Sequence, residues 1–137
     1  CKLMRVVLDT NCLIMAISSR NRYNIIWKSF LVGDYILCIT NEILEEYVEV
    51  IGRNISPTVA DMVAFTILTR KNVLKFDPHF RFNLIKADPD DNKFVDCAIV
   101  SGAKCVVTED KHFRVLDSIS FPHVDIVGID AFISTLK

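Results

Sequence analysis

Apolar blocks of two lengths alternate along this chain and predict strands and helices in turn. Short, mostly apolar runs such as Arg5–Asp9, Tyr35–Ile39 and Lys104–Thr108 are typical of strands that are buried on both faces of a sheet. Between them lie longer stretches with large apolar residues at helical spacing and capping residues at their starts. This alternation predicts an α/β fold, in which helices cover both faces of a parallel sheet.

The expected elements follow one another with few residues between them. We expect strands at Arg5–Asp9, Tyr35–Ile39, Asn72–Phe76, Lys104–Thr108 and Val124–Val127. We expect helices at Cys12–Ser18, Asn24–Val32, Asn41–Ile51, Pro57–Thr69, Asp91–Ser101, Lys111–Leu116 and Asp130–Leu136. Gly33, Gly52 and Gly102 fit the ends of the helices that precede them. The stretch Asp77–Pro89 has mixed charge and a proline near each end, which predicts a loop.

The length and composition suit one domain. The chain has 137 residues, of which 51% are hydrophobic and 24% charged, so it can bury enough apolar surface to offset the lost chain entropy. We therefore expect a single domain over residues 1–137. No apolar run approaches the ~20 residues that span a bilayer, and no leader pattern opens the chain. We expect a cytoplasmic protein that does not contact a membrane.

Charge and cysteine content narrow the chemistry. A net charge of −1 argues against a protein that coats DNA, but it is compatible with an enzyme that meets RNA through a local basic patch. The five cysteines are scattered through the chain, mostly in apolar runs, and form no C-x-x-C pair. We expect them to be reduced core residues rather than zinc ligands or disulfides.

Three acidic residues fall where parallel strands end. Asp9 ends the first strand, Asp110 follows the Lys104–Thr108 strand, and Asp91 heads the helix that leads into that strand. Because ligands of an open parallel sheet bind beyond the carboxyl ends of its strands, we expect these carboxylates to converge. Clustered carboxylates repel one another unless a cation neutralises them, and oxygen ligands suit Mg²⁺ or Mn²⁺. The pattern predicts metal-assisted hydrolysis of a phosphodiester.

Four sequence blocks resemble the motifs of PIN-domain nucleases. The blocks are Val7–Asn11, Thr40–Val50, Asp88–Ala98 and Val106–Asp110, and they occur in the order and with the spacing of that family. Bacterial PIN proteins that act as toxins of toxin–antitoxin pairs (VapC-like) are the most similar subgroup. The resemblance implies a three-layer α/β/α fold with a central parallel sheet of about five strands. It also implies one or two Mg²⁺ or Mn²⁺ ions and endoribonuclease activity.

The resemblance assigns roles to individual residues. The catalytic and metal-binding positions are Asp9, Glu46, Asp91 and Asp110. The supporting positions are Thr10, Asn11, Thr108 and Asp96. The first three supporting residues match motif positions that orient a carboxylate or a water, and the last is an auxiliary acid.

The choice of glutamate depends on the family pattern. At ~100° per residue, Glu45 and Glu46 fall near opposite margins of the apolar stripe of their helix. Helical geometry alone therefore does not choose between them, and the family pattern favours Glu46.

RNA and a protein are the expected partners. RNA affinity comes from cations that contact phosphates, and we expect Arg20, Arg22 and Lys111 to bind RNA. The helical stretches Tyr23–Leu31 and Val59–Leu68 are rich in large apolar residues, which indicates an interface. The resemblance supports two uses of this surface, an antitoxin peptide or a homodimer. The residues alone do not choose between the two.

Two alternatives compete with the nuclease. A PIN-like scaffold binds RNA or protein without cleaving it, although all four acidic positions are filled here. An aspartate-based phosphotransfer protein also carries an Asp at the end of a strand. Phosphatases of that kind need a second acid two residues later, where this chain has Asn11. Each acid taken alone also fits a helix cap or a turn, so the nuclease prediction depends on the acids lying together.

Overall fold

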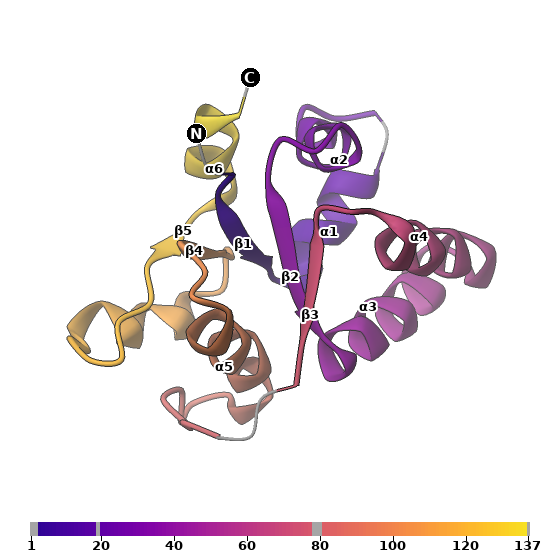
Figure 1. Ribbon diagram of the computed structural model, residues 1–137. Helices are drawn as coiled ribbons and strands as arrows, with labels where there is room; N and C mark the ends of the chain where they lie inside the picture. The colour runs from indigo at the N-terminus through magenta and orange to yellow at the C-terminus, as the bar shows by residue number, and fades with distance from the viewer. Residues whose placement is uncertain (1–2, 19, 78–80, 137) are drawn as a thin grey trace.

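Within residues 3–18, 20–77 and 81–136, which the computed structural model describes, five parallel strands form one sheet (Figure 1). In spatial order the strands are β3 (Val73–Phe76), β2 (Ile36–Thr40), β1 (Arg5–Leu8), β4 (Cys105–Val107) and β5 (Ile126–Val127). Every neighbouring pair is parallel. The expected parallel sheet is therefore confirmed.

Helices cover the sheet on both faces. They are α1 (Thr10–Ile17), α2 (Asn24–Leu31), α3 (Asn41–Asn54), α4 (Pro57–Thr69), α5 (Asn92–Ser101) and α6 (Ile129–Thr135), with the 3₁₀ helices η1 (Pro89–Asp91) and η2 (Lys111–Ser118). Figure 1 shows α1 to α4 on one side of the sheet and α5 on the other. The protein thus has the three-layer α/β/α fold that the sequence predicted.

The order of the strands creates a crevice at the carboxyl ends of β1 and β4. From β1 the chain moves outward to β2 and β3, and it then returns past β1 to β4 and β5. Strands β1 and β4 are neighbours, with Leu8 paired to Val107. Connections that leave two adjacent strands on opposite faces open a crevice between them, where α/β proteins bind their ligands. Asp9 and Thr108, the residues that follow these two strands, lie at this point.

Apolar side chains of the strands and the inner helix faces make the core. Val6, Val7 and Leu8 of β1 are almost completely buried, because β1 is the central strand and is covered on both sides. Four cysteines, Cys12, Cys38, Cys97 and Cys105, are buried and free, as expected of core residues. Cys1 lies outside the described residues. Within the described ranges, no helix combines the length and apolarity needed to cross a membrane.

The predicted stop at Gly52 is wrong, because α3 continues to Asn54. Gly33 and Gly102, which do end helices, have positive φ angles of 85° and 66°, whereas Gly52 stays within the helix. Helix α4 packs along this last turn, and a Cβ on Gly52 would be 3.8 Å from the Cβ of Ala60. Tertiary packing against α4 therefore outweighs the local helix-ending tendency of glycine. The extra turn extends α3 beyond its predicted end.

Candidate active site

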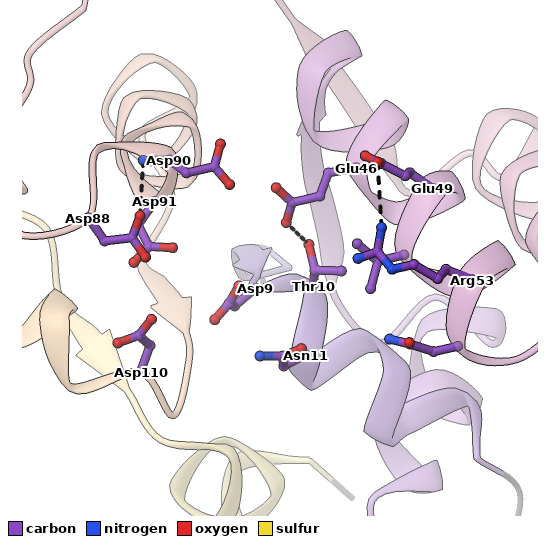
Figure 2. A pocket seen from close by; sticks show the side chains of 12 residues that line it. Asp9, Thr10, Asn11, Glu46, Glu49, Arg53, Asp88, Asp90, Asp91 and Asp110 are labelled. Atoms are coloured by element: carbon purple, nitrogen blue, oxygen red, sulfur yellow. Dashed lines mark hydrogen bonds and ion pairs between the residues drawn. The ribbon is translucent and has the colours of Figure 1, made fainter.

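An acidic pocket of about 400 Å³ opens at the carboxyl edge of the sheet (Figure 2). Its acidic lining comes from Asp9, Glu46, Glu49, Asp88, Asp90, Asp91 and Asp110. These residues belong to segments that are far apart in the sequence and that the fold brings together. The four acidic positions that the family motif assigns all line this one pocket.

Asp9 lies at the bottom of the pocket, between β1 and α1. It is 7% exposed, and its Oδ2 accepts a 2.7 Å hydrogen bond from Thr108 Oγ1. Its side chain does not cap α1, so the structure gives no support to a capping role for this carboxylate. Burial raises the pKa of Asp9, the hydrogen bond from Thr108 lowers it, and the charges of Glu46 and Asp110 raise it further. The net effect is a pKa above the ordinary value for aspartate.

Glu46 and not Glu45 faces the pocket. The Oε2 of Glu46 accepts a hydrogen bond from Thr10 Oγ1, whereas Glu45 is exposed and lines a separate hollow beside Arg81. The next residue, Tyr47, is fully buried and donates a 2.6 Å hydrogen bond to the Leu8 carbonyl. This anchor fixes the rotation of α3 about its axis, and it turns Glu46 toward the end of β1.

On the opposite side of the pocket, three carboxylates and one imidazole form a compact group. One oxygen each from Asp88, Asp91 and Asp110, and one ring nitrogen of His112, lie within 4.8 Å of one another. The Oδ2 of Asp91 is buried and has no hydrogen-bond partner. Burial raises the pKa of Asp91 to about 7, with further contributions from the charges of Asp110, Asp88 and Asp9. A divalent cation would reduce the repulsion between the carboxylates, and it would also give the unpaired oxygen of Asp91 a partner.

His112 is a member of this group that the sequence pattern did not single out. Its side chain is 39% exposed, and its Nδ1 lies 3.2 Å from Asp110 Oδ1. The angles do not make this contact a hydrogen bond, so the buried Nδ1 has no partner. Asp110 instead accepts the His112 backbone N–H at 2.9 Å and thereby begins η2. The spacing of two residues between Asp110 and His112 was the only sequence signal for this neighbour.

Lys93 is a cation of the site that the sequence did not single out. Its Nζ donates to Glu46 Oε1 and, at 2.9 Å, to Asp90 Oδ1. Its side chain is 9% exposed. Burial lowers the pKa of Lys93, but the hydrogen bonds and charges of Glu46 and Asp90 outweigh burial and raise it. Lys93 is therefore a fixed positive charge between two acidic residues that line the pocket.

Of the four supporting positions, three lie at the pocket and Asp96 does not. Thr10 and Asn11 form the first turn of α1 and line the pocket, and Thr108 holds Asp9. Asp96 does not line the pocket, because five residues along α5 from Asp91 correspond to a rotation of about 140°. Its Oδ1 instead accepts the backbone N–H of Phe82 at 3.1 Å. Asp96 thus contacts the loop before η1 rather than the acidic group.

The predicted RNA-binding cations lie outside the pocket. Arg20 and Arg22 follow the far end of α1, and Arg22 forms an ion pair with Asp130. Lys111 is exposed at the start of η2 and does not contribute to the lining. The cation that does line the pocket is Arg53. It belongs to the last turn of α3, beyond the predicted helix end, so sequence reasoning missed it.

Several solved structures of toxin–antitoxin proteins share this fold. The DNA-bound VapBC of Salmonella typhimurium aligns with a TM-score of 0.60 and 21% identity, covering 93% of this chain and 99% of that one. VapBC2 of Rickettsia felis, bound to a DNA fragment from its promoter, gives a TM-score of 0.63, 17% identity, and coverage of 91% and 98%. VapC20 of Mycobacterium tuberculosis, a toxin that cleaves the Sarcin-Ricin loop, aligns with a TM-score of 0.53 and 12% identity, covering 74% of this chain and 86% of that one. At these identities the likeness establishes the fold.

Sequence comparison identifies the family. No curated protein matches the chain. The sequence profile of the PIN domain matches residues 5–112. This range covers most of the chain, including β1 to β4 and all four acidic motif positions. The chain therefore belongs to the PIN-domain family.

Proposed function

We propose that this protein is a metal-dependent endoribonuclease and that the acidic pocket is its active site. The observation that carries the proposal is the convergence of carboxylates from separate elements at the switch point of the sheet. Asp9 follows β1, Asp110 follows β4, and Asp91 belongs to η1. Keeping these charges together is unfavourable without a cation, and the pKa of Asp91 is raised first by burial and then by the neighbouring carboxylates. Membership of a nuclease family agrees with this use of the pocket.

The donor atoms suit Mg²⁺ or Mn²⁺. Asp88, Asp91 and Asp110 offer the oxygen ligands that both ions prefer, and the imidazole of His112 adds a donor that Mn²⁺ accepts more readily. The unpartnered, buried Oδ2 of Asp91 is the atom most in need of such a ligand. When bound, the ion supplies Lewis-acid stabilisation of the charge that develops as a phosphodiester is hydrolysed.

The chain's own side chains orient the acids and hold the substrate. Thr108 turns Asp9 into the pocket, and Thr10 turns Glu46 toward it. Arg53 is 63% exposed and has only a loose ion pair, 3.6 Å from Glu49, among the described residues. It is therefore available to bind a phosphate of an RNA strand that lies across the pocket.

RNA is the proposed substrate, and toxicity the proposed role. Support comes from the fold shared with VapC20, a toxin that cleaves the Sarcin-Ricin loop, and with two VapBC complexes. The net charge of −1 favours a local rather than a global RNA contact, and Arg53 is the cation that lines the pocket. A toxin of this kind acts in the cytoplasm, where its RNA substrate is found.

The exposed face of α4 is the proposed site for an antitoxin. Met62, Phe65 and Leu68 are 63%, 70% and 57% exposed, which is unusual for side chains of this size. Met62 also lines an apolar hollow of about 260 Å³ between α1, α2 and α4, to which Trp27 contributes as well. An amphipathic peptide would bury this surface. A homodimer through the same face is the alternative, and light scattering of the protein alone and of Phe65→Glu distinguishes the two.

RNA cleavage by the purified protein tests the main proposal. We would incubate an end-labelled, mixed-sequence single-stranded RNA with Mn²⁺, with Mg²⁺ and with EDTA, and a DNA of the same sequence in parallel. The variants are Asp9→Asn in the pocket and Asp61→Asn on the exposed face of α4 as a matched control. We expect internal cleavage of RNA that needs the metal, is lost in Asp9→Asn and persists in Asp61→Asn.

Other outcomes favour the alternatives. A folded protein that binds Mn²⁺ but leaves every RNA intact would favour a scaffold without catalysis. Formation of an aspartyl phosphate from a small phosphodonor, lost in Asp9→Asn, would favour a phosphotransfer protein. Cleavage that persists in Asp9→Asn would exclude the acidic pocket as the active site.

A further inference from the structure

We propose that Lys93 is a built-in cation that takes the place of a second metal ion, so that the acidic pocket binds a single divalent cation. The inference rests on the proposed metal-dependent function and specifies how many ions that function uses. The pocket has two parts, a compact group of donor atoms without a cation and a second group of carboxylates that already bind an ammonium.

The first part of the pocket contains the donor atoms that suit a divalent cation. Only Asp88, Asp91, Asp110 and His112 bring donor atoms within 4.8 Å of one another among the described residues. Glu46 is not a member of this group, although the family motif assigns it a metal-binding role. Figure 2 shows Glu46 on the opposite wall of the pocket from Asp91 and Asp110, with Asp9 between the two walls.

The second part of the pocket is held by Lys93. Both carboxylate oxygens of Glu46 already have a donor, Oε2 from the Thr10 hydroxyl and Oε1 from Lys93 Nζ. Lys93 also bonds Asp90, whose carboxylate faces Glu46 across the pocket in Figure 2. Its ammonium therefore occupies the position between two carboxylates that a second cation would otherwise need.

Burial makes this ammonium a permanent part of the site rather than a surface ion pair. The Lys93 side chain is 9% exposed, and that of Glu46 is 18% exposed. Exposed pairs such as Arg53 and Glu49, at 63% and 71%, are weakened by water and salt, whereas a buried pair is screened much less. A divalent ion placed beside Glu46 would meet the full repulsion of this fixed positive charge.

Counting bound Mn²⁺ per chain tests the inference without any cleavage assay. The free ion is followed by its electron paramagnetic resonance during titration of the wild type, Lys93→Gln, Lys93→Arg and Lys86→Gln. Lys86 is an exposed lysine in the same region and serves as the matched control. We expect one ion for the wild type, for Lys93→Arg and for Lys86→Gln, because each keeps a cation at position 93. We expect two ions for Lys93→Gln, because Glu46 and Asp90 are then free to bind metal.

A second variant keeps the test decisive if Lys93→Gln does not fold. Glu46→Gln removes the partner of Lys93 and leaves the compact group unchanged, so its Mn²⁺ affinity should stay within about threefold of the wild type. Loss of a true ligand should lower the affinity by about tenfold or more, and such a loss in Glu46→Gln would overturn the inference. Two ions in the wild type, or one ion in a folded Lys93→Gln, would overturn it as well. No bound ion in any variant would refute the proposed metal site itself.

Discussion

The hydroxyl of Thr108 donates a 2.7 Å hydrogen bond to the carboxylate of Asp9 and so joins the ends of β4 and β1. The same oxygen accepts the backbone N–H of Asp110 at 3.0 Å. One buried threonine therefore orients one acidic side chain of the pocket and the backbone of another. It does so at the point of the sheet where ligands of α/β proteins bind.

Replacing this threonine should cost both stability and activity. Thr108→Val keeps the shape of the side chain but removes the donor to Asp9 and the acceptor for the Asp110 N–H. We expect a loss of about 1–2 kcal/mol in the free energy of unfolding and a lower cleavage rate, because buried polar groups lose their partners. Urea denaturation measures the first effect. The control is Thr69→Val, whose hydroxyl bonds only carbonyls within α4; an equal loss there would contradict a special role for Thr108.

Neutralising Asp9 should abolish cleavage and leave the fold intact. Asp9→Asn keeps an oxygen that can accept the hydrogen bond from Thr108. It removes the negative charge of a carboxyl group whose pKa is raised by burial. In metal-free protein at neutral pH we expect the stability to stay the same or to rise by up to about 1 kcal/mol, since repulsion within the pocket is relieved. Thermal unfolding in EDTA measures this. A large drop in melting temperature would show that the carboxylate is structural.

The stability of metal-free protein should fall as the pH rises from about 4 to about 7. The pKa of Asp91 is raised by burial and by neighbouring carboxylates to about 7, from an unfolded value of 3.8. A carboxyl with a raised pKa holds its proton longer in the folded state, so its contribution to stability is complete below the unfolded pKa and is lost as the pH passes the folded pKa. Denaturant titrations in EDTA across this range check the slope.

A variant separates Asp91 from the other acids that titrate in this range. Asp91→Asn does not titrate, so its stability should depend less on pH than that of the wild type between about pH 4 and 7. Asp61→Asn, on the exposed face of α4, is the matched control and should keep the slope. Parallel curves for the wild type and Asp91→Asn would contradict the assignment.

His112 should tune the choice of metal. If its imidazole is a ligand alongside Asp91 and Asp110, His112→Gln should lower Mn²⁺ affinity by about tenfold and change Mg²⁺ affinity much less. Isothermal titration calorimetry with each ion measures the two affinities. His123, which is exposed and bonded to Asp125, provides the control variant His123→Gln. Equal losses for both ions in His112→Gln would point to a structural role for the ring.

Local sequence patterns determined most of the fold. The apolar runs that became β1, β2 and β4 are buried on both faces, and such runs are recognisable without neighbours because their burial demands uninterrupted apolar residues. The placement of Asp9 and Asp110 just after two of these strands was readable for the same reason. Parallel strands put their carboxyl ends at one edge, so the convergence of acids follows from the order of the elements alone.

Only the tertiary structure decided which side chains complete the site. Glu45 and Glu46 are equivalent on a helical wheel, and the choice falls to Glu46 because Tyr47 is locked to the Leu8 carbonyl. Arg53 reaches the pocket because packing against α4 carries α3 past Gly52. Contacts such as these join residues that are distant in the sequence, and local propensities contain no information about them.

Lys93 shows most clearly the difference between what the sequence determines and what the tertiary structure determines. In the sequence it is one lysine among many, three residues after Asp90 and 47 residues from Glu46. Its role depends on the contact of α5 with α3, which places the ammonium beside Glu46 while it also bonds Asp90. The sequence alone determined where the acids would gather. The packing of helices onto the sheet decided how their charge is balanced, because electrostatic energy depends on distances that only the folded chain defines.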